Sequence, residues 1–224
     1  MATQDVLSHL RTVGDADRAV RDAAYHKTER EVLGVPVPVL TDVSKDLRRQ
    51  TDLDGRIALA DGLWQSGVFE ARILAAKLFV QARIPEDDTV WALLVSWVPE
   101  FDGWAIADTA SGAIARRLTA DPSRLDVVEA WASADALWTK RAAFVTTLPW
   151  TKQRHPKPDD QAVRERVLTW ATQAVTDHRW FIQKAIGCWL RDLSKRDPDR
   201  VVAFLALHAA QMKPFAAKEA GRLL

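Results

Sequence analysis

The sequence contains very little cysteine. Its 224 residues include one, Cys188, so an internal disulfide is excluded and the Cys-x-x-Cys spacing of many metal and redox sites is absent. The five histidines also show no spacing typical of metal ligands, and we expect no metal. A reducing compartment, the cytoplasm, is the simplest location for such a chain.

Long hydrophobic runs are missing as well. No apolar stretch approaches the roughly 20 residues that a membrane-spanning helix needs. The first residues, MATQDVLSHLRTV, lack the basic and then apolar layout of a signal peptide. With 48% hydrophobic and 27% charged residues, the composition is that of an ordinary globular protein without a membrane partner.

Positive charge is scarce in the first part of the chain and concentrated in the rest. Residues 1–150 carry a formal net charge of −5, whereas residues 151–224 carry +6. Such asymmetry indicates an anionic partner for the C-terminal part. Chance polarity of a solvated surface gives the same pattern, so charge alone does not decide between them.

Patterns typical of β-strands are also absent, and almost every segment has helical periodicity. Asp-Pro pairs at 121–122 and 197–198 mark two helix starts. We predict helices over residues 4–12, 15–30, 37–50, 55–66, 68–83, 87–97, 102–118, 122–133, 136–148, 160–176, 179–195, 198–211 and 214–222.

The predicted helices come in pairs with short connections, and a pair takes roughly 35–45 residues, the period of HEAT-type repeats. The sequence therefore predicts an all-α, HEAT-like α-solenoid that forms one domain over residues 1–224. In such a fold, stacked antiparallel helix pairs make a C shape whose concave face is lined by the second helix of each pair. A closed helical bundle is the alternative, but it gives no reason for polar stripes on alternate helices.

One polar stripe lies in the predicted helix FDGWAIADTASGAIARRL, residues 101–118. Ile106, Ala110 and Ile114 recur at the spacing of a core face. Trp104 and Asp108 are four residues apart and lie roughly 200° around the helix from Ile106, at about 100° per residue. A large ring and a carboxylate that both point away from the core suit a functional site, although a packing tryptophan beside a solvated charge fits the pattern too.

A second stripe lies in residues 180–195. Ile182, Ile186, Trp189 and Leu193 form its core face, and a line of three cations and a cysteine lies opposite: Lys184, Cys188, Arg191 and Lys195. Such a line could follow a phosphate backbone, and it could also be a solvated face.

Two further cations, Lys140 and Arg141, lie early in the helix predicted over 136–148. The helix dipole disfavours cations at that end. We therefore expect a carboxylate or a phosphate to hold Arg141, whose forked donors suit both.

Three strings together resemble the DNA alkylation repair family, the AlkD-like HEAT-repeat DNA glycosylases. They are GWAIAD with Trp104 and Asp108, LWTKRAA with Arg141, and FIQKAIGCWLRDLSK over 181–195. Tyr25-His26-Lys27 followed by LGVPVPVL at 33–40 is similar to the opening region of the family. The resemblance covers residues 20–222.

The resemblance implies a solenoid that cradles duplex DNA and hydrolyses the N-glycosidic bond of cationic purines alkylated at N3 or N7. The catalytic carboxylate of the family falls on Asp108, its partner tryptophan on Trp104 and its arginine on Arg141. Such an enzyme needs neither a metal nor a nucleotide cofactor. No lysine has a good claim to Schiff-base chemistry, so we expect a glycosylase without lyase activity that works as a monomer.

The chain departs from the family at Cys188, where members usually carry a tryptophan. Trp189 does not replace it, because one step along a helix turns the side chain by about 100°, onto the core face. Three alternatives follow: a pocket widened for bulky adducts, a DNA binder with little or no excision, or a nucleophilic cysteine. A lone cysteine on a helix is usually inert packing, which weakens the third.

We therefore expect Asp108 to stabilise charge and position water, Trp104 to pack against the lesion and Arg141 to bind a phosphate. The remaining DNA contacts are expected from Lys184, Cys188, Arg191, Lys195, Lys140, Lys27 and Lys218. The alternatives are a non-catalytic binder of damaged or branched DNA and a scaffold for other proteins.

Overall fold

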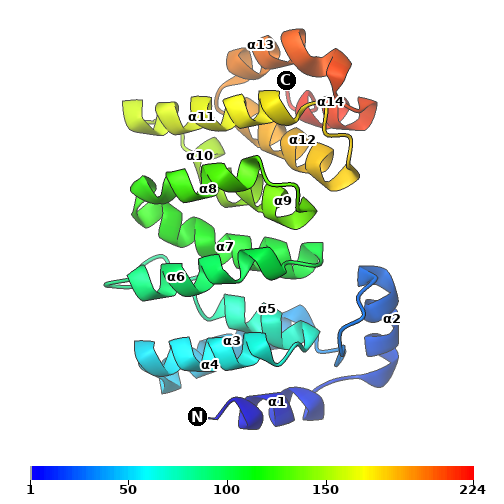
Figure 1. The fold of residues 1–224 in the computed structure, drawn as a ribbon, viewed down its shortest axis with the longest axis vertical. Helices are drawn as coiled ribbons and strands as arrows, with labels where there is room; N and C mark the ends of the chain where they lie inside the picture. Colours follow the sequence, from blue (N-terminus) through cyan, green and yellow to red (C-terminus); the bar gives the residue numbers. More distant parts are fainter. Residues whose placement is uncertain (1) are drawn as a thin grey trace. The chain divides into compact units, whose positions relative to one another are not determined.

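The computed structural model describes residues 2–224, and within them it contains fourteen α-helices, three 3-10 helices and no strand. The predicted all-α fold class is confirmed. The helices form two compact units, one that ends at Ala120 and one that spans Asp121–Leu224 (Figure 1).

The first unit contains α1 (Thr3–Thr12), α2 (Ala16–His26), α3 (Val37–Gln50), α4 (Leu53–Gln65), α5 (Phe69–Lys77), α6 (Asp88–Ser96), η1 (Val98–Glu100) and α7 (Trp104–Ala120). The second contains η2 (Pro122–Arg124), α8 (Leu125–Ala132), α9 (Leu137–Thr146), α10 (Leu148–Thr151), α11 (Pro158–Ala174), α12 (Trp180–Ser194), α13 (Pro198–His208), η3 (Ala209–Gln211) and α14 (Pro214–Ala220).

Helix α5 is the centre of the first unit. It packs against α3, α4 and α7, and every residue from Phe69 to Ala76 is buried. A helix that is buried all round has no single apolar stripe, because each of its faces meets another helix. The N-terminal end of α7, which carries Trp104, is placed by this packing.

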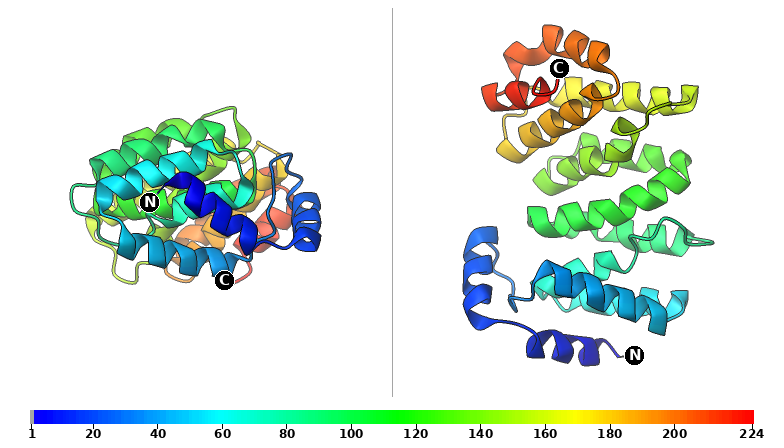
Figure 2. Two further views of the ribbon diagram at one scale, coloured as in Figure 1. Left: turned by 90° about the horizontal axis from the view of Figure 1, so that it is seen from below. Right: turned by 180° about the vertical axis from the view of Figure 1, so that it is seen from behind.

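Helix α2 is the exception in this unit. It runs crosswise to α3 and α4 at one end of them (Figures 1 and 2), and none of its residues is buried. The loop after α2 approaches its first turn closely: a Cβ on Gly34, whose φ is +72°, would lie 2.1 Å from the carbonyl oxygen of Asp15. Only glycine fits there without strain.

Helix α12 is the centre of the second unit, where it packs against α9, α10, α13 and α14. The predicted core face is confirmed, because Ile182, Ile186, Trp189 and Leu193 are all buried. The predicted starts at the Asp-Pro pairs are also confirmed. Asp121 accepts from the backbone N–H of Ser123, and Asp197 accepts from that of Arg200.

Several helices end earlier than their periodicity predicts. The helix predicted over 68–83 stops at Lys77. Arg48 donates to the carbonyl of Lys77, and Arg117 donates to those of Gln81 and Ala82, so these carbonyls bind guanidinium groups instead of helical N–H groups. The helix predicted over 15–30 stops at His26, because Lys27 adopts a left-handed conformation with φ 51°.

An ion-pair group in the second unit gives a pH-dependent stability. Asp177 accepts from Arg179 at 2.9 Å and from Lys140 at 3.0 Å, and these cations hold the pKa of Asp177 well below 3.8, although burial opposes them. A depressed pKa stabilises the fold above the unfolded-state value and loses that contribution as the pH falls below it. Wild type should therefore unfold at a higher temperature than Asp177→Asn at neutral pH, and the difference should shrink below about pH 3.8.

Thermal unfolding of both proteins across this range is the measurement. Asp159→Asn, at an exposed carboxylate of α11, is the control and should change the unfolding temperature much less than Asp177→Asn does at neutral pH. A difference between wild type and Asp177→Asn that stays constant down to about pH 2 would contradict the assignment.

Candidate functional site

Trp104 and Asp108 lie on the side of α7 that does not pack into the core. Ile106, Ala107 and Ala110 are buried, whereas Trp104 and Asp108 are each partly exposed. The predicted arrangement of this helix is therefore confirmed. The turn before the helix is tied down by an ion pair between Asp102 and Arg30 of 2.6 Å.

Trp104 belongs to a group of four rings, which we call the aromatic wall: Tyr25, His26, Phe69 and Trp104. The His26 ring lies 4.9 Å from that of Trp104 and 4.8 Å from that of Phe69, between centroids. Tyr25 meets Trp104 edge-on at 6.0 Å. Edge-to-face and tilted contacts at these distances are the favourable geometries for aromatic pairs, so they hold the indole in place.

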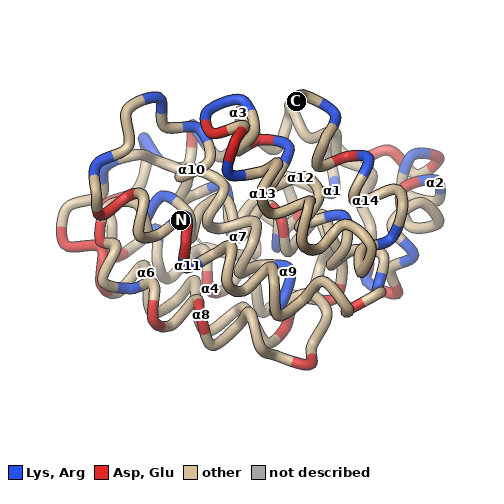
Figure 3. The backbone as a smooth tube through the Cα atoms, turned by 90° about the horizontal axis from the view of Figure 1, so that it is seen from above, with Lys and Arg blue, Asp and Glu red and all other residues tan. Residues whose placement is uncertain are grey.

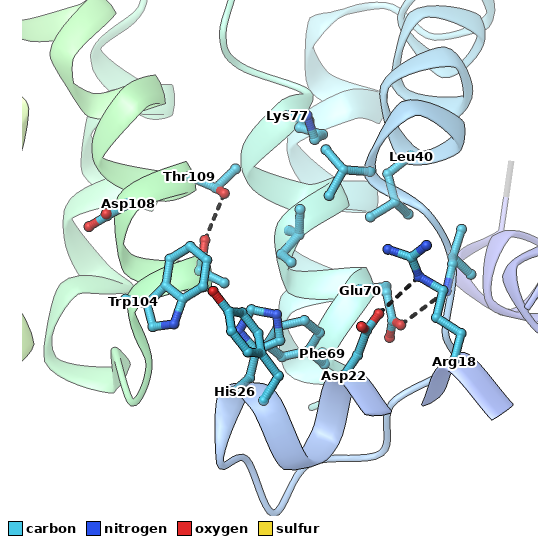
Figure 4. Close-up of a pocket in the computed structure, with 15 residues that line it drawn as sticks. Arg18, Asp22, His26, Leu40, Phe69, Glu70, Lys77, Trp104, Asp108 and Thr109 are labelled. Atoms are coloured by element: carbon cyan, nitrogen blue, oxygen red, sulfur yellow. Dashed lines mark hydrogen bonds and ion pairs between the residues drawn. The ribbon is translucent and has the colours of Figure 1, made fainter. Parts of the chain in front are cut away.

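A pocket of about 430 Å³ opens beside the aromatic wall, within the first unit (Figure 4). The aromatic wall and Asp108 contribute to its lining, and Val35, Leu40 and Ile73 form an apolar part. Its charged lining residues are Arg18, Asp22, Glu70, Lys77 and Asp108, three carboxylates and two cations. Aromatic faces combined with an excess of carboxylates favour a ligand that is flat and positively charged.

Two stacked indoles belong to the network of contacts that holds the segment before α7. The rings of Trp64 and Trp97 are 4.3 Å apart and inclined by 3°, and the Arg72 guanidinium lies 4.3 Å over Trp64. Arg72 also pairs with Glu100 at 2.7 Å. Because Glu100 accepts from the Trp64 indole at 3.1 Å as well, one network fixes the segment that leads into Trp104.

Glu70 fixes the loop that follows α2. It is 2% exposed, and its carboxylate accepts from the backbone N–H groups of Leu33 at 2.9 Å, Gly34 at 2.7 Å and Val35 at 3.2 Å. A buried carboxylate is tolerated because these donors replace water. The contact joins α5 to the chain just beyond Tyr25 and His26.

In the second unit, the stripe on α12 is present but its cations have carboxylate partners. Glu219 of α14 pairs with Arg191 and lies 3.8 Å from Lys184. Burial raises the pKa of Glu219, but Arg191 and Lys184 outweigh it and lower the pKa. Lys195 lies 3.7 Å from Asp192.

Cys188 lies within this group of charges. Its Sγ is 3.9 Å from Glu219 Oε1 and 3.8 Å from the Arg191 guanidinium. The side chain is partly exposed, between Lys184 and Arg191 on the same face of α12.

The remaining predicted site residues are spread over both units. Arg141 donates to the carbonyl of Phe181 at 3.0 Å and lies 5.7 Å from the centroid of its ring. Lys140 pairs with Asp177, while Lys27 and Lys218 are exposed. Acidic and basic residues lie interspersed along the chain (Figure 3).

The structure adds Tyr25, His26 and Phe69 to the predicted pair on α7. Tyr25 and His26 belong to the opening string that the resemblance singled out, but no role was predicted for them. The place of Phe69 in the site could not be predicted from the sequence, because a phenylalanine in an apolar helix is normally interpreted as a core residue.

Within residues 2–224, no group of three His, Cys, Asp or Glu side chains is placed to hold a metal ion, and no helix is long and apolar enough to cross a membrane. The sequence matches the family model described as DNA alkylation repair enzyme over residues 6–224. The chain belongs to this family. Membership supports a role in DNA repair, with DNA as the partner.

Solved structures with a similar fold were also found. A predicted DNA alkylation repair enzyme from Enterococcus faecalis has a TM-score of 0.77 at 22% identity, over 94% of this chain and 96% of that one. AlkD2 from Streptococcus mutans has a TM-score of 0.67 at 17% identity, over 100% and 99%. The fold is thus the HEAT-like helical solenoid of AlkD-type proteins. No protein of curated function matches the sequence.

Proposed function

We propose that this member of the DNA alkylation repair family is a monofunctional DNA glycosylase that removes cationic alkylated purines from duplex DNA. The observation that carries the proposal is that Trp104 and Asp108 both lie outside the buried core face of α7 and both line one pocket. We further propose that residues 1–224 act as one DNA-binding domain, as a monomer in the cytoplasm.

The chemistry needs little activation, because the base is already a good leaving group. When the bond from C1′ of the sugar to the purine nitrogen breaks, both electrons leave with the purine and cancel its positive charge. The sugar becomes an oxocarbenium-like cation. Asp108 stabilises that cation and orients a water whose oxygen forms the new bond to C1′, and the proton that this water loses passes to the surrounding water. Trp104 attracts the cationic purine through its ring face.

In this proposal the second unit supplies contacts to phosphates. Arg141 binds a phosphate flanking the lesion, and Lys184, Arg191 and Lys195 of α12 hold the backbone, with help from Lys140 and Lys218. Lys27 adds a contact from the first unit. Cys188 lies at the DNA surface, where its small side chain leaves room beside an N3 or N7 adduct that a tryptophan would fill.

The direct test is single-turnover release of 7-methylguanine and 3-methyladenine from alkylated duplex DNA. Release well above the uncatalysed rate supports the proposal. If neither base is released, bulky N3 and N7 adducts are the next substrates, and a protein that releases none of them while it binds DNA is the non-catalytic DNA binder.

Salt dependence distinguishes both DNA-binding functions from a protein scaffold. Each phosphate contact contributes a slope of about −0.9 to the plot of log affinity against log salt. Lys184→Gln combined with Arg191→Gln should therefore make the slope shallower by about 1.8, measured by fluorescence anisotropy with a labelled duplex. Lys45→Gln, at an exposed position of α3, is the control and should leave the slope unchanged. A slope that the double variant does not alter would remove α12 from the DNA interface.

A further inference from the structure

His26 is placed where its charge acts on Trp104. It is the last residue of α2, and its ring lies between Phe69 at the start of α5 and Trp104 at the start of α7. The centroid distance to Trp104 is 4.9 Å and the ring planes are inclined by 40°. A change in the charge of this imidazole is therefore felt directly by the indole.

The surroundings of His26 favour its neutral form. Its Nδ1 is buried and has no hydrogen-bond partner, so a proton added there would form an N–H without an acceptor. Burial lowers the pKa of His26 below 6.5, although Asp22 and Glu70 oppose this shift. At neutral pH the ring is an uncharged aromatic group.

The other charged groups near His26 come from each helix that packs around it. Asp22 on α2 is paired with Arg18 at 3.0 Å, and Glu70 on α5 is satisfied by three backbone N–H groups. Lys77 of α5 donates to Thr41 at 2.9 Å, and Asp108 of α7 lines the same pocket. The three carboxylates and two cations that line the pocket sum to one negative charge, so a proton on His26 would cancel the excess that favours a cationic ligand beside Trp104.

That charge would oppose a cationic base. An indole attracts a cation through the negative quadrupole of its face. A protonated His26, whose ring centroid lies 4.9 Å from that of Trp104, would compete for that attraction and would repel a second cation bound at the same indole. At the effective dielectric constant near a protein surface, like charges at such separations lower affinity by about tenfold.

We propose that His26 is a positioning residue that keeps Trp104 receptive to a cationic base while its imidazole is neutral, and that protonation of His26 closes this face to cations. The inference rests on the proposed function, since the cation in question is the alkylated purine. The preference for positively charged lesions then depends partly on His26 of α2, a helix that contributes no group to the bond-breaking step.

The first experiment is the pH profile of 7-methylguanine release under single-turnover conditions, corrected for uncatalysed loss. In wild type the rate should fall about tenfold between about pH 7.5 and about pH 5, with a midpoint below 6.5. His26→Phe preserves a ring between Phe69 and Trp104 but does not titrate, so this fall should be absent. His155→Phe, the same change at an exposed histidine, should keep it.

The second experiment needs no catalysis. The pKa of His26 is followed by NMR in the Asp108→Asn protein bound to a duplex with one 7-methylguanine, and bound to the same duplex with guanine. By linkage, the cationic base should lower the pKa of His26 by about one unit relative to guanine, which corresponds to the tenfold effect above. His26→Phe identifies the resonance.

The two experiments separate failure of this inference from failure of the proposed function. The role of His26 would be overturned if its pKa were equal in the two complexes, even if the enzyme releases base. It would also be overturned if the rate of release by His26→Phe still fell between about pH 7.5 and about pH 5. If the protein releases no base but the pKa of His26 differs between the two duplexes, the role of His26 stands and the proposed glycosylase activity does not.

Discussion

Asp108→Asn is expected to lower the single-turnover release of 7-methylguanine by about 10²–10³-fold, the usual effect of removing one group that stabilises transition-state charge. The amide has nearly the shape of the carboxylate, so the α7 face and the pocket beside it should be unchanged. What is lost is the negative charge that stabilises the oxocarbenium-like sugar and the acceptor that orients water. The substrate complex should still form, because phosphate contacts come from other residues.

A binding measurement and a control variant show whether the loss is specific to catalysis by Asp108. The dissociation constant for the same alkylated duplex should stay within about twofold, since affinity comes mainly from the phosphate backbone. Asp54→Asn, at an exposed carboxylate of α4, should leave base release unchanged. Full activity of Asp108→Asn would exclude Asp108 as the catalytic carboxylate.

Glu70→Ala should lower the thermal midpoint of unfolding by roughly 10 °C. The change leaves the backbone N–H groups of Leu33, Gly34 and Val35 without their acceptor, and each such buried group costs about 1–3 kcal/mol. Even at the lower end of this range the three groups total about 3 kcal/mol, which lowers the midpoint of a chain of this length by about 6–12 °C. Calorimetry of the purified variant measures it.

The matched control is Glu29→Ala, which removes an exposed glutamate from the same loop and should shift the midpoint by less than about 2 °C. Glu70→Gln should fall between the two, because its amide oxygen accepts some of the same bonds without the charge. If the thermal midpoint of Glu70→Ala equals that of wild type, other contacts stabilise the loop and the Glu70 carboxylate does not.

The face of α7 that carries Trp104 and Asp108 could be predicted because it follows from helical periodicity alone. Ile106, two positions from each member of the pair, and Ala110 are buried, so the core lies on the other side of the helix. The aromatic wall could not be predicted in the same way. Tyr25 contacts Trp104 from 79 residues away in the chain and Phe69 contacts His26 from 43 residues away, and periodicity within one helix carries no information on such contacts.

The stripe on α12 shows a different limit. Its spacing identified Lys184, Arg191 and Lys195 on one face, and their core-facing counterparts are buried as predicted. The position of Glu219 beside two of these cations depends on how α14 packs on α12, which only the fold determines. The spacing of the cations therefore predicts which face of α12 they share, but it does not predict the net charge of that face in the folded protein.

The weak attachment of α2 has a consequence for how often the site is ready to bind. A helix without buried residues opens locally at a small part of the free energy of global unfolding, and its amide hydrogens exchange accordingly. Tyr25 and His26 leave Trp104 whenever α2 opens. The measured dissociation constant for a lesion is then the intrinsic constant divided by the fraction of molecules in which α2 is docked. A substitution that only tightens α2 would raise affinity without touching DNA.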